Sequence, residues 1–192
     1  VGKTAEILGK NEIAKEYLNL SEEIRKAIVE EYYTTTGRLA LKNQTAYVLS
    51  LFFDIAPQYK ERTVKDLVER LKADKNHLKT GFIGTPYICR VLSDNGYNEL
   101  AYTLLLNKGL PSWLYAVNMG ATTIWERWNS VMPDGKMNPQ GMNSLNHYAY
   151  GAIAEWMYRH MAGINETAPG FKKAVIRPQV DWRIGSANCY LD

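Results

Sequence analysis

The sequence predicts a mainly α-helical fold that ends in a short β segment. Stretches with an apolar stripe on one face alternate with stretches that are apolar nearly all round, and glycine-rich loops join them. After residue 171 the pattern changes to β-branched and aromatic residues punctuated by proline and glycine, which is typical of short strands. Paired helices in two concentric layers, an α/α toroid, would produce this alternation. A plain bundle or a solenoid would look similar, and no strict repeat is present that would select a solenoid.

The first long helix is expected over residues 12–33, where apolar side chains recur in helical steps. They are Ile13, Tyr17, Leu20, Ile24, Ile28 and Tyr32. The threonine, glycine and polar residues of 34–43 predict a loop. Residues 44–53 have few polar side chains, and we expect them to form a helix that is buried on both sides.

Pro57 suits the first turn of the next helix, because the N–H that proline lacks has no partner there in any case. The apolar face of this helix would consist of Val64, Leu67, Val68 and Leu71. Opposite charges four residues apart should add support, and the expected pairs are Glu61–Lys65 and Asp66–Arg70.

Residues 77–86 contain two glycines and a proline, which predicts a loop. Two further helices are expected at about 85–94 and 97–107. The turn signal "DNGY" separates them.

The last helix has the clearest pattern. Its unbroken apolar stripe consists of Leu145, Tyr148, Ala149, Ala152, Ile153, Trp156, Met157 and Met161. Glu155 and Arg159 lie on the opposite face, and Gly163 is expected to end the helix.

The tail, residues 172–192, is expected to contain two short strands divided by Pro178 and Gly185. These strands disagree with an all-helical fold. They would be the first strands of a further domain.

Composition excludes several function classes. The chain has 192 residues, of which 46% are hydrophobic and 22% charged, as in an ordinary globular unit. The net charge of +3 comes from scattered residues, so no basic stripe points to nucleic acid or to an anionic membrane. The longest apolar run, 46–53, is too short to span a bilayer. The beginning, "VGKTAEILGKNE", has no initial methionine and no signal-peptide core, so we expect a piece of a longer protein and leave its localisation open.

No metal site or cofactor is predicted. Cys89 and Cys189 lie far apart in the sequence without metal-ligand spacing, and two buried thiols are expected rather than a disulfide. The histidines also lack such spacing: His160 is expected in the core and His77 in a loop. Phosphate-loop, dinucleotide, nucleophile-elbow and zinc-protease motifs do not occur.

Glu126 is the strongest candidate for chemistry, because it stands between two tryptophans in "WERW". A carboxylate among large aromatic rings is costly unless something stabilises or uses it. Arg127 could neutralise it, and the pair would then only fix a loop. Alternatively, aromatic faces beside a carboxylate suit sugar C–H surfaces and a developing oxocarbenium ion. The stacking candidates are Trp113, Trp125 and Trp128, although each is also a candidate core residue.

His147 is expected at the start of the last helix, where its ring could reach a ligand hydroxyl or simply pack. Residues 133–144 connect Glu126 to His147 and show no periodicity. Loops this long inside compact domains are usually functional. Unaided, the residues therefore indicate a glycoside-binding helical toroid.

Several segments closely resemble bacterial α-L-rhamnosidases of the six-hairpin (α/α)6-barrel type, glycoside hydrolase family 78. These segments are "TGFIGTPY", "GYNELAYTLLLNKGLPSWLYAV", "GATTIWERWNS", "DGKMNPQGMNSLNHYAYGAIAEWMYRHMAGI" and "PGFKKAVIRP". The resemblance extends from about residue 5 to the end of the chain, in order and without large gaps.

The resemblance implies an inverting hydrolase that removes terminal α-L-rhamnose from a glycoside or polysaccharide, without a cofactor. The general base of the family matches Glu126, and the histidine that contacts the sugar matches His147. The residues around them that could bind the substrate are Trp113, Trp125, Arg127 and Trp128. Residues 1–165 would be part of the catalytic barrel, and 166–192 the start of a C-terminal β-sandwich domain.

The family's general acid lies upstream of anything that matches this chain, so the chain alone is expected to be inactive. Apolar inner helices such as 44–53 would then face an open side, and self-association is expected. Two alternatives remain open: a non-catalytic helical carbohydrate-binding module, and a six-hairpin glycosidase acting on another sugar. The sequence upstream of this chain would distinguish the non-catalytic module from an enzyme.

Overall fold

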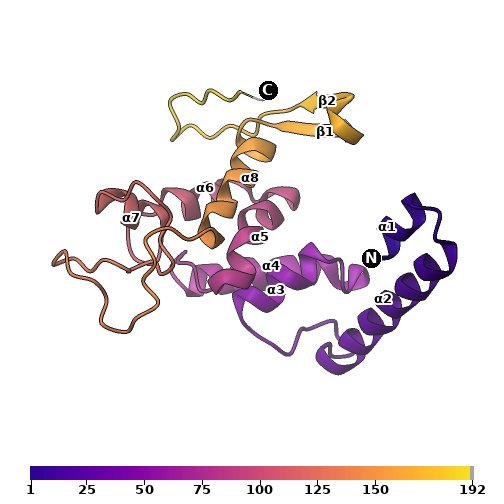
Figure 1. Ribbon diagram of the computed structural model, residues 1–192. Coiled ribbons are helices and arrows are strands. Elements are labelled where there is room, and N and C mark those ends of the chain that lie inside the picture. Colours follow the sequence, from indigo (N-terminus) through magenta and orange to yellow (C-terminus); the bar gives the residue numbers. More distant parts are fainter. Residues whose placement is uncertain (191–192) are drawn as a thin grey trace.

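The computed structural model describes residues 1–190, which form helices packed around one central helix, α5, with a two-stranded sheet at the C-terminal end (Figure 1). The helices are α1 (Gly2–Ile7), α2 (Asn11–Tyr32), α3 (Gln44–Phe52), η1 (Pro57–Tyr59), α4 (Lys60–Ala73), α5 (Gly81–Asp94), α6 (Asn98–Leu106), α7 (Trp113–Asn118), η2 (Ala149–Ala152), α8 (Ile153–Trp156), η3 (Met157–Met161) and η4 (Pro169–Phe171). The strands are β1 (Ile164–Ala168) and β2 (Lys173–Ile176). The mainly helical fold is therefore confirmed.

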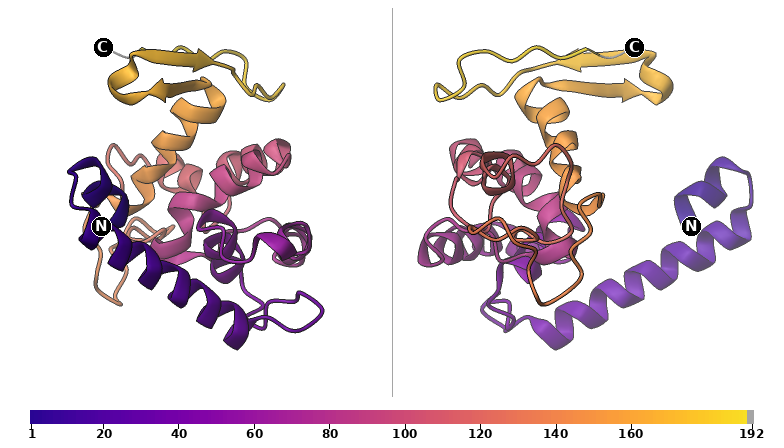
Figure 2. Two further views of the ribbon diagram at one scale, coloured as in Figure 1. Left: turned by 90° about the vertical axis from the view of Figure 1, so that its right-hand side faces the viewer. Right: turned by 60° about the vertical axis from the view of Figure 1, so that its left-hand side comes forward.

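Helices α1 and α2 form a hairpin that stands apart from the other helices (Figure 2). Helix α2 has the predicted bounds to within a residue, but its apolar side is largely uncovered: Tyr17, Leu20 and Ile24 are each at least 40% exposed. Arg25 connects it to the main body by donating from Nη1 to the carbonyl oxygen of Ile55 at 3.1 Å. The exposed apolar face of the chain thus lies on α2.

The core lies where α3, α5 and α6 pack together with α4 and the last helix. Its almost fully buried residues include Val48, Leu67, Leu71, Ile88, Leu92, Tyr102, Leu104 and Trp156. Burying one large aliphatic side chain contributes about 1.5–3 kcal/mol, so this cluster is the main source of stability. Helix α3 packs on both α4 and α5, but Leu49, Leu51 and Phe52 are only half-buried and Phe53 is 57% exposed, so the expectation that 44–53 would face an open side stays a prediction.

The predicted apolar face of α4 is confirmed, but the predicted ion pairs are not. Asp66 accepts from Arg62 at 2.9 Å, and Arg70 pairs with Asp74. Asp74 is the reason for the change, because its carboxylate is nearly inaccessible and needs several donors. The described ion pairs do not include Glu61–Lys65. The Arg70 hydrogen bonds hold the pKa of Asp74 far below its ordinary value.

The prediction of a loop over 77–86 is confirmed for residues 77–80 and wrong for 81–86, because α5 begins at Gly81 and contains Pro86. Gly84 is required for packing, because a Cβ on it would lie 2.9 Å from Thr80 Cβ and 3.2 Å from Thr45 Oγ1. Gly84 therefore allows α5 to approach α3 closely, rather than marking a loop. Thr85 also donates to the Gly81 carbonyl oxygen at 2.6 Å, which holds the first turn of the helix.

The last helix begins later than the sequence predicts. It runs from Ala149 as a 3-10 turn, continues as α8 and ends in the π-helical turn η3. Leu145 and Tyr148 precede it and are 41% and 85% exposed, so they do not belong to its apolar stripe. Their backbone belongs to the loop that pairs with residues 123–126, described below. Gly163 follows the helix with φ of 72°, which is the expected terminating conformation.

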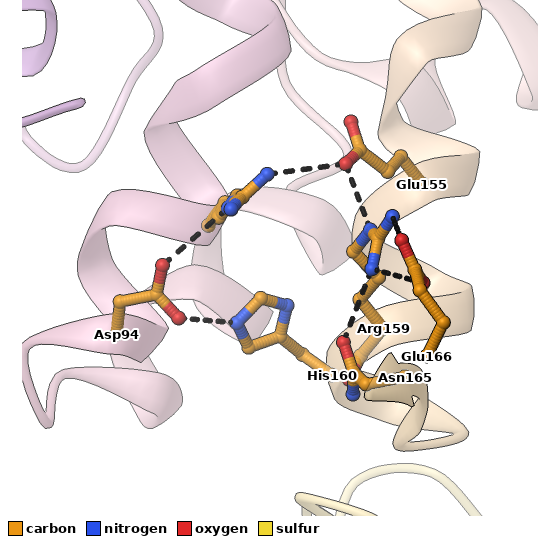
Figure 3. A network of polar contacts seen from close by, with 7 residues as sticks. Asp94, Glu155, Arg159, His160, Asn165 and Glu166 are labelled. Carbon is orange, nitrogen blue, oxygen red and sulfur yellow. Dashed lines mark hydrogen bonds and ion pairs between the residues drawn. The ribbon is translucent and has the colours of Figure 1, made fainter. Parts of the chain in front are cut away.

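A network of charged and polar side chains connects the end of α5 to the last helix and β1 (Figure 3). Its members are Arg90, Asp94, Glu155, Arg159, His160, Asn165 and Glu166. His160 is 6% exposed and lies 2.8 Å from Asp94 through Nε2, so its predicted core position is confirmed. This hydrogen bond lowers the pKa of Asp94. The network therefore restrains the orientation of the last helix relative to α5.

Strands β1 and β2 pair antiparallel, with Ile164 opposite Ile176. The prediction of two strands within 172–192 is wrong for the described residues, because the first strand lies earlier and 177–190 form none; residues 191 and 192 lie outside the described part. The reason is that residues after Ile176 bind to α6 instead of pairing with a strand. Cys89 is a buried free thiol, as predicted, whereas Cys189 is a free thiol that is only half-buried, because the tail lies on the surface.

The segment after β2 is held on α6 by side-chain hydrogen bonds. The carbonyl oxygen of Gln179 accepts from Tyr102 at 2.8 Å, and its N–H donates to the carbonyl oxygen of His160 at 2.8 Å. Arg183 donates to Thr103 Oγ1 and to the carbonyl oxygen of Glu99, both at 2.8 Å. These bonds join the tail to the helical body.

We expect Gly163→Ala to destabilise the protein strongly. A Cβ there would overlap with the carbonyl carbon and oxygen of Arg177, whose N–H donates to the Gly163 carbonyl oxygen at 2.9 Å. Gly170→Ala is the matched control, because Gly170 has φ of 69° but open space around it. The control should show only the cost of the left-handed backbone, about 1–2 kcal/mol. Urea unfolding followed by circular dichroism measures both, and equal losses would contradict the close contact.

The tail should loosen in acid through Asp181. Hydrogen bonds from Arg183, at 2.7 Å from both Nε and Nη2, lower the pKa of Asp181 from 3.8 to about 2. A carboxyl whose pKa is lowered by folding stabilises the protein above its ordinary pKa, and this stability is lost as the pH falls through the folded value. Asp181→Asn should therefore lower the melting temperature near neutral pH. The difference from wild type should shrink between pH 3.8 and about 2; a difference that persists at pH 2 would contradict this.

Candidate active site

Two backbone segments lie side by side and position the candidate residues. The N–H of Glu126 donates to the carbonyl oxygen of Ser144 at 2.9 Å, and the N–H of His147 donates to that of Ile124 at 2.8 Å. Thr123 Oγ1 also donates to the carbonyl oxygen of Leu145. The long loop between the two segments thus closes on itself, and it brings Glu126 and His147 to neighbouring positions although 21 positions separate them in the sequence.

Glu126 is half-buried as a whole residue, and its carboxylate is bound by the backbone. Its Oε2 accepts from the Ser144 N–H at 3.0 Å. Arg127 does not neutralise it, contrary to the sequence-based suggestion, because the guanidinium donates to Gln140 Oε1 at 2.8 Å and to the carbonyl oxygen of Gly141 at 3.3 Å. The ion pairs of the described residues do not include Glu126. Its carboxylate therefore keeps one oxygen available for a further partner.

A hollow of about 410 Å³ lies beside this carboxylate. It is lined by Phe82, Glu126, Arg127, Trp128, Asn129, Met142 and Tyr150. Three of these seven residues are aromatic, namely Phe82, Trp128 and Tyr150, and Glu126 supplies the one carboxylate among them. Aromatic rings beside a single carboxylate are the arrangement expected for a sugar ring and an attacking water.

His147 lies outside the helix, two residues before η2, and not at the helix start that the sequence predicts. Its ring stacks on Phe82, with the centroids 5.1 Å apart and the planes 16° apart. Its Nδ1 accepts from the N–H of Ala149 at 3.3 Å. Because Nδ1 is the acceptor of the neutral ring, Nε2 carries the proton and can donate to a hydroxyl.

The three tryptophans differ in accessibility. Trp113 and Trp125 are only 7% and 6% exposed, and Trp113 donates from Nε1 to the carbonyl oxygen of Tyr150 at 2.8 Å. Trp128 is half-buried and stacks on the Tyr150 ring with the centroids 3.8 Å apart. Trp113 and Trp125 line a second hollow of about 260 Å³ on the other side of Trp128 and Tyr150, which line both hollows. Trp128 is therefore the tryptophan that reaches the space beside Glu126.

Sequence reasoning missed Phe82 and Tyr150. Phe82 lies in the stretch that the glycines marked as a loop, and the early start of α5 places it at the hollow. Tyr150 lies within the predicted last helix, but it is not among the residues that form the apolar stripe of that helix. The spacing of three residues from His147 was its one available signal, because that spacing places two residues on one side of a helical turn.

Comparison with known proteins identifies the family of the chain. The sequence profile of the bacterial alpha-L-rhamnosidase 6 hairpin glycosidase domain matches residues 1–161. The chain belongs to this family. It is 45% identical over 188 residues to an α-L-rhamnosidase of Alteromonas sp. (strain LOR), covering 96% of this chain and 20% of that protein. It is 42% identical over 181 residues to an α-L-rhamnosidase of Streptomyces avermitilis, covering 94% of this chain and 17% of the relative.

Solved structures show the same six-hairpin fold. The Streptomyces avermitilis α-L-rhamnosidase in complex with L-rhamnose matches with a TM-score of 0.86 and 41% identity, over 93% of this chain and 17% of that one. The native α-L-rhamnosidase of Aspergillus terreus matches with a TM-score of 0.87 and 33% identity, over 92% of this chain and 21% of that one. The six-hairpin glycosidase chain described here thus spans about a fifth of the length of the curated relatives it matches.

Residues 1–190 are predicted from the sequence to contain neither a metal site nor a membrane span. Their His, Cys, Asp and Glu side chains form no group of three or more that could hold a metal ion. Within the same residues, every helix is too short or too polar to cross a membrane.

Proposed function

We propose that this chain supplies the general-base side of an inverting α-L-rhamnosidase active site, with Glu126 as the base. The observation that supports this most directly is the Glu126 carboxylate, which is held by one backbone N–H at the edge of an aromatic hollow. The relatives are named α-L-rhamnosidases, and one related structure contains L-rhamnose. The proposed substrate is therefore a rhamnose-containing glycoside or polysaccharide.

In the proposed reaction, Glu126 accepts a proton from a water molecule as that water attacks the anomeric carbon. The Ser144 N–H holds one carboxylate oxygen, so the other can face the water. A second carboxyl, protonated and about 6.5–9.5 Å away, must donate to the departing oxygen. Glu126 is the one carboxylate among the residues that line the hollow, so the acid has to come from outside this lining.

The sugar would contact the aromatic wall and His147. Trp128, Tyr150 and Phe82 present ring surfaces at the hollow, which suit the C–H faces of a pyranose. His147 Nε2 would donate to a sugar hydroxyl. Trp113 and Trp125 support Trp128 in this proposal, through the edge-on packing of Trp113 against it at 5.4 Å and through the wall of the second hollow.

Two further expectations remain proposals. We propose that residues 166–192 begin a C-terminal β-sandwich domain, while residues 1–165 belong to the barrel. We also propose that the chain alone self-associates, and that the uncovered apolar side of α2 is the contact. Size-exclusion chromatography tests the latter, and a monodisperse monomer would contradict it.

Glu126→Gln should lower kcat about 10²–10⁴-fold on an aryl α-L-rhamnoside, measured in the protein as its gene encodes it. The amide keeps the shape of the side chain, and its oxygen can still accept from Ser144, but it cannot take the proton. Folding should be unchanged by circular dichroism. A variant that keeps more than about a tenth of the wild-type kcat would show that Glu126 is not the base.

The 192-residue chain by itself provides a second sample for the same assay, and we expect no turnover because its hollow has one carboxylate. Turnover that Glu126→Gln abolishes would place the acid within these residues. It would then contradict the view that the acid lies outside them.

His147→Ala should weaken rhamnose binding by about 1–3 kcal/mol, the cost of losing one hydrogen bond to a sugar hydroxyl. His77→Ala is the matched control, because His77 belongs to another loop, where its Nδ1 contacts the carbonyl oxygen of Lys75. Calorimetry with L-rhamnose measures both variants. Unchanged affinity in His147→Ala, together with unchanged kinetics, would leave His147 with a packing role against Phe82 only.

A further inference from the structure

Arg127 is bound at both of its ends to the long loop that it begins. Its backbone N–H donates to Ser130 Oγ at 3.1 Å, and Ser130 is completely buried. Its guanidinium donates from Nη2 to Gln140 Oε1 at 2.8 Å and from Nη1 to the carbonyl oxygen of Gly141 at 3.3 Å. Arg127, which follows Glu126 in the sequence, therefore binds the far side of the loop, at Gln140 and Gly141.

The side of the loop that Arg127 binds, residues 140–142, contains an unusual turn. Gly141 and Met142 both have positive φ, 71° and 51°. A methionine in this conformation is strained, and such a conformation persists only when its surroundings hold it. The Arg127 contact is made at the carbonyl group that directly precedes Met142. Two residues after Met142, the Ser144 N–H donates to the Glu126 carboxylate.

We propose that Arg127 is a positioning residue for the Glu126 carboxylate and does not contact the sugar. By holding the turn at 140–142, it keeps the Ser144 N–H directed at Glu126 Oε2. The inference rests on the proposed role of Glu126. It assigns to Arg127 a different task from the substrate contact that the sequence suggests.

The physical need for such a residue follows from where the base lies. Glu126 belongs to an irregular segment, outside the helices and strands. A catalytic group on a loop is less precisely held than one on a helix, and a misplacement of about 1 Å can cost about 100-fold in rate. The planar guanidinium of Arg127 can bind two acceptors at once, and both of its acceptors lie within the same turn.

The test uses Arg127→Met in the protein as its gene encodes it, with an aryl α-L-rhamnoside as substrate. We expect kcat to fall about 10–100-fold while KM changes less than about threefold, because the base is displaced but the sugar contacts remain. Arg127→Lys should recover part of the rate, because an ammonium can still reach one acceptor. A rise in KM with unchanged kcat would overturn the proposal and favour direct sugar contact.

Gln140→Ala tests the same contact from the acceptor side. It should lower kcat less than Arg127→Met does, and it should add no further loss in the Arg127→Met background, because both changes break the same contact. Lys136→Met is the control: it removes a positive charge from the same loop, but its side chain is 82% exposed and pairs only with Asp134. It should leave kcat unchanged. Additive losses in the double variant would overturn the proposal.

Hydrogen exchange tests the positioning role of Arg127 independently of the proposed rhamnosidase function. The peptide covering 140–147 should exchange faster in Arg127→Met than in wild type, whatever the substrate is. Unchanged exchange would overturn the positioning role even if the wild type hydrolyses rhamnosides. Faster exchange in Arg127→Met, when the wild type shows no rhamnosidase activity, would instead refute the proposed function and confirm the loop contact.

Discussion

The close packing of α5 against α3 is the contact on which the other features depend. It requires the bare Cα of Gly84, since a side chain there would press on Thr80 and Thr45. The same helix places Phe82 at the hollow near its beginning and Asp94 against His160 at its end. One helix thus sets both the wall of the candidate active site and the direction of the last helix. Separating α5 from α3 would disturb both.

Apolar burial and the polar network have different tasks in this arrangement. Ion pairs at a protein surface generally contribute little stability, whereas each large core side chain contributes about 1.5–3 kcal/mol. The network of Figure 3 therefore adds little stability, but its hydrogen bonds have fixed directions. It orients the last helix and β1, while Trp156 and its neighbours hold them in place.

The candidate active site combines a rigid wall with a restrained loop. Trp128 and Tyr150 stack closely, and Trp113 packs edge-on against Trp128, so the aromatic wall has little freedom. The carboxylate of Glu126 lies on an irregular segment whose conformation depends on backbone pairing with 144–147. Restraint by hydrogen bonds replaces the regular secondary structure that would otherwise fix a catalytic side chain.

The helical class, the bounds of α2 and α3, the apolar face of α4 and the terminating role of Gly163 could all be predicted from the sequence, because helical periodicity and capping are local properties. The resemblance to six-hairpin rhamnosidases identified the family. Three features depend on the packed structure: Gly84 belongs to a helix, Asp74 takes Arg70 from Asp66, and the tail binds α6 instead of forming a second strand after Pro178. The sequence also did not predict that Phe82 lines the hollow or that Arg127 donates to Gln140. Each of these depends on which distant group is nearest in space, and spacing along the chain does not encode that.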